Sequence, residues 1–158
     1  MRNIYTINFE NVTIANSGGD QELFYIAPAD DRPVTILGWE LAQFSDVGDA
    51  AEEILRLRLI RGHTTVGSGG GSVTPVPLHR RGVAAGATCR INDTTIASAG
   101  TAENLWSGGL NIRAPQPFIL PPEYRPTVDQ AQGSIVLRLM AAPADDVTMS
   151  GTLWLEEQ

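Results

Sequence analysis

The sequence predicts an all-β protein, a single antiparallel β-sandwich of the jelly-roll type, and three observations support this prediction. Apolar and polar residues alternate along several segments, with the period of two that buries one face of a strand. The 16 Gly and 10 Pro fall mainly between the apolar runs, where turns are expected. No stretch of about ten residues has a convincing helical period, so the pattern offers no crossover helices for a parallel sheet.

The expected strands follow one another along the whole chain, about eight to ten in number, as a sandwich or jelly roll requires. An apolar run at residues 34–41 is interrupted by Gly38, and Leu alternates with Arg in residues 54–60. Just before that alternation, residues 50–53 could form one helical turn, and we expect a short turn or bulge that leads into the strand. The clearest candidate strands are residues 1–14, 23–26, 34–41, 54–60, 135–140 and 147–156.

The pentapeptide Ala-Pro-Ala-Asp-Asp occurs twice, at residues 27–31 and 142–146. Each copy follows one apolar run and precedes another. Pro presets its own φ and Asp bonds to nearby backbone, so this is turn chemistry. We expect each copy to join two neighbouring strands as a hairpin. A calcium site formed by the paired Asp is the alternative, although calcium needs six to eight oxygen ligands from a defined loop.

Residues 62–78, with the sequence GHTTVGSGGGSVTPVPL, are the richest in Gly, Ser and Pro. The spacing of Gly62 and Gly67 resembles a phosphate-binding loop, but Ser68 stands where the Lys should be and Gly69 where the Ser or Thr should be. Pro75 and the next Pro also prevent a helix from following. We therefore predict one domain over residues 1–158, with a long mobile loop at 62–78 that continues into an extended Pro-rich arm.

The charge and the cysteine content exclude several kinds of partner and site. The net charge of −7 disfavours nucleic acid, since cations carry that binding. No apolar run is long enough to span a bilayer, so we expect no membrane partner. Cys89 is the only cysteine, which excludes an intrachain disulfide and a Cys-based zinc site and suggests a packed apolar residue.

No set of residues indicates catalysis, and we expect neither an enzyme nor a cofactor or metal. His63 and His79 lack a nucleophile motif or metal-ligand spacing. Glu40, Glu103 and Glu123 are the candidates for a glycosidase pair, because glycanases use jelly rolls and need two carboxylates at a set separation. The alternative for each is solvation or pairing with an Arg, such as Glu40 with Arg56 or Arg58 across a sheet.

Aromatic and Arg side chains give the candidate binding residues. Two of the Trp residues lie inside predicted strands and are expected in the core, whereas Trp106 precedes two Gly and Tyr124 lies between prolines. We expect these last two rings to be exposed, either as sugar platforms or in a protein interface, which aromatic residues and Arg favour. The predicted interface residues are Arg80, Arg81, Trp106, Tyr124 and Arg125.

Several segments together resemble the small virion-associated proteins of tailed-bacteriophage and prophage structural gene clusters, and the likeness covers nearly the whole chain. The segments are residues 43–62, the GSGGGS of residues 67–72, the ENLW of residues 103–106, the LPPEYRP of residues 120–126 and the ending at residues 140–157.

The resemblance implies a capsid decoration, or cement, protein with a β-sandwich or jelly-roll body on the outer surface of the virion. Its implied partners are the major capsid protein and further copies of itself, typically as a homotrimer. The acidic charge and the absence of a catalytic set agree with this hypothesis. A carbohydrate-binding module or head-fibre protein that contacts the host surface is the alternative function.

Overall fold

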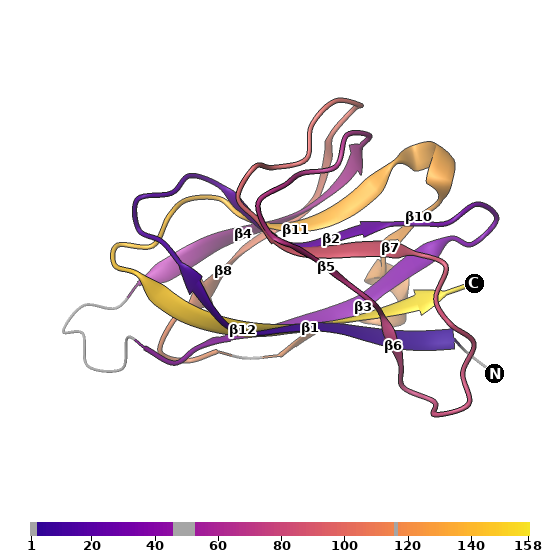
Figure 1. Ribbon diagram of the computed structural model, residues 1–158, viewed down its shortest axis with the longest axis horizontal. Helices are drawn as coiled ribbons and strands as arrows, with labels where there is room; N and C mark the ends of the chain where they lie inside the picture. Colours follow the sequence, from indigo (N-terminus) through magenta and orange to yellow (C-terminus); the bar gives the residue numbers. More distant parts are fainter. Residues whose placement is uncertain (1–2, 46–52, 116) are drawn as a thin grey trace.

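Two antiparallel β-sheets pack face to face in the computed structural model, which describes residues 3–45, 53–115 and 117–158 (Figure 1). The predicted all-β sandwich is thereby confirmed. Sheet A contains, in spatial order, β10 (Thr127–Val128), β3 (Val34–Gln43), β12 (Val147–Glu157), β1 (Asn3–Ile14) and β6 (Val76–Pro77), and β9 (Phe118–Ile119) also pairs with β3. Sheet B contains β5 (Gly71–Val73), β7 (Thr88–Asp93), β2 (Gln21–Ala27), β11 (Ser134–Leu139), β4 (Ile54–His63) and β8 (Glu103–Asn111).

The strands pair in the order of a jelly roll. β1 pairs with β12, β2 with β11, β3 with β10 and β4 with β8, as in one long antiparallel hairpin that is rolled up so that successive strands enter alternate sheets. Because the first strand pairs with the last, Asn3 lies opposite Glu157 and both ends of the chain lie at the same end of the sandwich (Figure 1).

The two Ala-Pro-Ala-Asp-Asp turns do not close hairpins, and that prediction is wrong. Residues 27–31 lead from β2 in sheet B to β3 in sheet A, and residues 142–146 lead from β11 in sheet B to β12 in sheet A. Neither turn joins hydrogen-bonded strands, because in a rolled hairpin each turn at an end of the sandwich crosses between the sheets. The second turn instead holds its neighbour, since the carboxylate of Asp146 accepts a hydrogen bond from Asn16 N–H at 2.7 Å.

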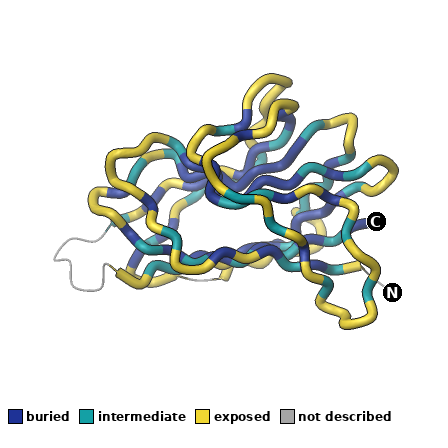
Figure 2. Tube along the Cα trace, viewed as in Figure 1, coloured by how far each residue is buried: buried dark blue, intermediate teal, exposed yellow. Residues whose placement is uncertain are grey.

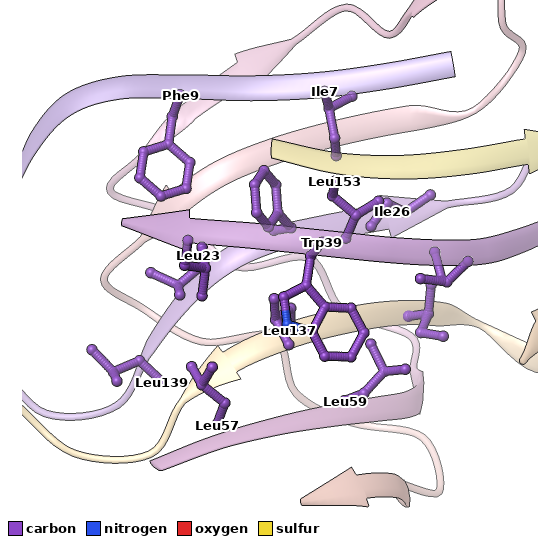
Figure 3. Packing of buried hydrophobic residues seen from close by; sticks show 14 of the residues in the cluster. Ile7, Phe9, Leu23, Ile26, Trp39, Leu57, Leu59, Leu137, Leu139 and Leu153 are labelled. Carbon is purple, nitrogen blue, oxygen red and sulfur yellow. The ribbon is translucent and has the colours of Figure 1, made fainter. Parts of the chain in front are cut away.

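The alternating pattern builds the core between the sheets. Along β12 every second residue is buried, whereas every residue of β11 is buried. Figure 2 shows buried residues along the strands of both sheets. Figure 3 shows side chains of both sheets meeting in this space, with Trp39 of β3 pointing toward Leu59 of β4. Cys89 is 2% exposed, which confirms its interpretation as a packed apolar residue. Burial, reinforced by the charge of Glu157, raises the pKa of its thiol from 9.0 to about 12.

Residues 62–78, predicted as one long loop, contain the end of β4, a loop that pairs with another loop, and the two short strands β5 and β6. Thr65 bonds with Ser98 and Ser68 with Thr95 through their backbones, β5 pairs with β7, and β6 pairs with β1. The glycines are needed for close approach: a Cβ on Gly67 would overlap the carbonyl oxygen of Thr95. Two loops, residues 64–70 and 94–102, thus lie together beyond sheet B, and we call them the flap (Figure 1). We expected a turn at residues 50–53, and of these the structure describes only residue 53.

Buried charges fix the flap to the outer face of sheet B. Arg138 Nη2 donates to Glu22 Oε1 at 2.7 Å, to His63 Nε2 at 3.0 Å and to the Ala97 carbonyl at 3.3 Å. Glu22 accepts a further hydrogen bond from Ala97 N–H at 2.9 Å. Because a guanidinium can only donate, Nε2 of His63 is the acceptor, and the proton on Nδ1 is donated to the Ala99 carbonyl. His63 therefore positions the flap.

Replacing Glu22 with Ala should lower the free energy of unfolding by about 3–5 kcal/mol, because Arg138 would stay buried without its carboxylate. Urea denaturation measures the change, and Glu10→Ala, which removes an exposed carboxylate, should change stability by less than about 0.5 kcal/mol. The double variant Glu22→Leu/Arg138→Met should recover most of the loss. Equal stability of Glu22→Ala and Glu10→Ala would contradict this account of the flap.

Candidate functional site

Three aromatic rings close one lateral side of the sandwich, between the edge of sheet B at β8 and the edge of sheet A at β9 and β10. Trp39 lies 5.1 Å from Trp106 in an edge-on arrangement, Trp39 lies 4.8 Å from Phe118, and Trp106 lies 5.0 Å from Phe118, all measured between ring centroids. We call this contact the aromatic triangle and the side that it closes the mouth. The triangle joins β3, β8 and β9 and so ties the two sheets together where no hydrogen-bonded strand does.

Two glycines make room for the triangle. Trp106 and Gly108 lie on the same side of β8, and a Cβ on Gly108 would overlap the indole ring, so the ring lies along the strand over the glycine. On β3, a Cβ on Gly38 would overlap the carbonyl oxygen of Phe118. The absence of a side chain there lets β9 approach β3 closely enough for Phe118 to meet both tryptophans.

The aromatic triangle separates two hollows, and the second of them is almost entirely apolar. The first, of about 290 Å³, lies between Trp39, Leu57 and Trp106. The second, of about 360 Å³, opens beside Tyr124, which is 74% exposed. It can take apolar side chains but offers few hydrogen-bonding groups. Its lining consists of Leu59, Leu105, Trp106, Phe118, Leu120, Pro121, Tyr124 and Pro126.

The structure brings three of the five predicted interface residues together. Tyr124 is exposed, as predicted, whereas the prediction of an exposed Trp106 ring is wrong because that ring packs partly buried in the triangle. Arg125 lies beside the mouth, and its Nε donates to the Leu120 carbonyl at 2.9 Å, which braces the turn that carries Tyr124. Arg80 and Arg81 are exposed between β6 and β7, at the opposite lateral side.

Phe118 is a part of the mouth that sequence reasoning missed, and Ile119, next to it on β9, is exposed beside the mouth but lines neither hollow. They are 36% and 56% exposed, although they belong to a strand. The signal in the sequence was the short apolar run 118–120 directly before two prolines. A run too short for a core strand and bounded by prolines is consistent with a partly exposed edge.

The three predicted carboxylates do not converge. Glu40 lies on β3 in sheet A, so it cannot pair with Arg56 or Arg58 of β4 in sheet B, and that predicted pairing is wrong. Glu103 forms an ion pair with Arg61 at 2.6 Å. Glu123 lies in a 3-10 helix, Pro122–Tyr124, at the mouth.

Glu40 instead shares a shallow hollow of about 470 Å³ on the outer face of sheet A with Glu10, which the sequence did not single out. The two strands that carry these carboxylates flank β12, which puts their backbones two strand spacings apart, about 9–10 Å. Asn8, Ser150 and Thr152 add polar groups to the lining, and Phe44, which is 59% exposed, adds an aromatic ring. We call this the sheet A hollow, and it is lined by Asn8, Phe9, Glu10, Glu40, Ala42, Phe44, Ser150, Gly151 and Thr152.

Comparison with known proteins identifies no relative: no family model, no curated protein and no solved structure matches the chain. In the part of the chain that the structure describes, no helix has the length and hydropathy of a membrane span. Among those same residues, no group of three or more His, Cys, Asp or Glu side chains is placed to hold a metal ion. The geometry of the mouth and of the sheet A hollow therefore carries the functional argument.

Replacing Gly108 with Ala should displace the Trp106 ring and lower stability by about 1–3 kcal/mol, as overpacking does in a core. Tryptophan fluorescence should shift to longer wavelength as the ring becomes more hydrated. Gly19→Ala is the matched control, because its new Cβ would meet nothing within 4 Å. Unchanged emission and stability in Gly108→Ala would show that the ring does not depend on this glycine.

Proposed function

We propose that this protein is a virion structural protein that decorates and stabilises the outer face of a bacteriophage capsid through protein–protein contacts. Its partners are the major capsid protein and further copies of itself, as a homotrimer. The observation that carries the proposal is the mouth, an aromatic surface with few polar groups. The three carboxylates that the sequence suggested for a glycosidase, Glu40, Glu103 and Glu123, do not converge on one site.

The composition of the mouth suits a protein partner. Interface centres are enriched in Tyr, Trp, Phe and Arg and depleted in charged residues other than Arg. Tyr124 and Ile119 present exposed apolar area, and Arg125 stands at the rim. An aromatic side chain that enters or covers such a hollow can act as a hot spot, while the surrounding contacts exclude water.

The rest of the body fits attachment to the outside of a lattice. A net charge of −7 disfavours the DNA side of a capsid and suits a surface that faces water. Jelly rolls serve in viral capsid and lectin domains, which is support by analogy of fold alone. Repeated copies on one lattice also gain strength from effective concentration, so each single contact can be modest.

Binding to capsids of the encoding phage, stripped of this protein, tests the proposal. The double variant Ile119→Ala/Tyr124→Ala should bind at least tenfold more weakly than the wild type, because both side chains are exposed and contribute little to the core. Phe44→Ala, which removes a similarly exposed ring far from the mouth, should bind normally. Bound copies per capsid are counted after sedimentation. Full occupancy by the double variant, or no binding by the wild type, would contradict the proposal.

A carbohydrate-binding module or head-fibre protein is the second candidate function, and the sheet A hollow is the observation that favours it. Sugars need both a ring to stack on and groups that hydrogen-bond to hydroxyls. The sheet A hollow combines exposed Phe44 with Asn8, Glu10 and Glu40. The mouth provides rings with few such groups.

Retention on a broad glycan array distinguishes the two candidates. A glycan-binding protein should lose retention in Phe44→Ala and keep it in Tyr124→Ala, the reverse of the capsid experiment. If the wild type retains no glycan on the array, the second candidate function is excluded.

A further inference from the structure

Exposed apolar side chains gather at the two opposite lateral sides of the sandwich. Of the nine large apolar side chains that are exposed in the described part of the chain, three lie at the mouth and three lie between residues 76 and 83. The first group is Phe118, Ile119 and Tyr124, and the second is Val76, Leu78 and Val83, which are 55–60% exposed. A cluster of exposed apolar side chains indicates an interaction surface, whereas single exposed apolar residues are common on any protein surface.

The second group includes a short edge segment of sheet A. Val76 lies on β6 and Leu78 directly follows this strand, and both side chains are exposed. Pairing of Val76 with Thr6 and the 2.9 Å hydrogen bond from Leu78 N–H to the Ile4 carbonyl hold this backbone against β1. Exposed Arg80 and Arg81 follow directly. We call residues 76–81 the β6 ridge.

The β6 ridge cannot reach the mouth of its own chain. β6 and β9 lie at opposite ends of sheet A, with β1, β12 and β3 between them. Four strand spacings of about 4.8 Å put roughly 19 Å between the two segments. Contact between the two surfaces therefore requires two copies of the chain.

The β6 ridge carries net positive charge beside its apolar pair, whereas the charges at the mouth are mixed. The mouth has exposed Glu123, the ion pair of Glu103 with Arg61, and Arg125 at its rim. Arg80 and Arg81 stand next to the apolar pair of the β6 ridge. On a chain with a net charge of −7, two adjacent cations select one orientation of approach and disfavour others.

We infer that copies of this chain associate head to tail, with the β6 ridge of one copy seated on the mouth of the next. Val76 and Leu78 cover the apolar hollow beside Tyr124, and Arg80 and Arg81 lie against Glu123 and Glu103. Such a heterologous contact closes into a ring when the rotation between copies allows it. The inference rests on the proposed function in one respect: self-association is part of that proposal, and the head-to-tail contact names the two surfaces that would make it.

Two variants that each block one surface test the inference by light scattering and sedimentation velocity. The ridge variant is Val76→Asp/Leu78→Asp, and the mouth variant is Ile119→Arg/Tyr124→Arg. The wild type should form a discrete oligomer, and each variant alone should be monomeric. An equimolar mixture should form a 1:1 dimer and nothing larger, because one intact ridge then meets one intact mouth. Val66→Arg, a charge placed on an exposed side chain of the flap, should leave the wild-type oligomer unchanged.

A monomeric wild type at about 100 µM, or variants that still assemble alone, would overturn the inference, and so would a mixture that remains monomeric. Circular dichroism verifies folding, and if the mouth variant fails to fold, Tyr124→Arg alone replaces it. Capsid binding by the same proteins separates this inference from the proposed function. If the mixed variants form dimers but the protein does not bind capsids, only the proposed function is refuted. If the mixed variants remain monomeric but the protein binds capsids, only the head-to-tail contact is refuted.

Discussion

The contact among Trp39, Trp106 and Phe118 is the constraint on which the mouth depends. These rings join β8 of sheet B to β9 of sheet A, where no hydrogen-bonded strand connects the sheets. Each aromatic pair contributes about 0.5–1.5 kcal/mol beyond the area that it buries. β9 is only two residues long, so ring packing acts together with two backbone hydrogen bonds, Leu120 N–H to the Leu37 carbonyl and Ile36 N–H to the Pro126 carbonyl, to fix the chain that carries Tyr124.

The two lateral sides of the sandwich differ in a way that suits an assembling protein. One side is a hollowed apolar surface with Glu123 and Arg125 at its rim, and the other is a short apolar edge segment with two cations, Arg80 and Arg81. The flap, which precedes β5 and β6 in one loop and β8 in the other, is held on sheet B by the buried pair of Arg138 and Glu22. In the proposed assembly, the body is a rigid spacer and the lateral sides make the contacts.

The alternating pattern predicted the fold class and six of the twelve strands that the structure describes, because burial of one strand face leaves a period of two in the sequence. It could not assign a strand to a sheet, since both sheets carry the same period; the Ala-Pro-Ala-Asp-Asp turns and the partner of Glu40 were mispredicted for this reason. The exposure of Tyr124 could be predicted from the neighbouring prolines. The exposure of Trp106 could not, because Gly108, which suggested an exposed turn, is the residue that makes room for the indole ring. Arg138 and Glu22 are 116 residues apart, and no local pattern links them.

Hydroxyl-radical footprinting of the assembled wild-type protein tests most directly whether the mouth is a contact surface, because it reports the solvent exposure of single side chains. The account predicts that Tyr124 and Ile119, open in the isolated chain, become strongly protected above the concentration at which the protein assembles. Phe44, on the outer face of sheet A, should remain fully reactive as the internal reference. Equal reactivity of Tyr124 in the monomer and in the assembly would contradict the account.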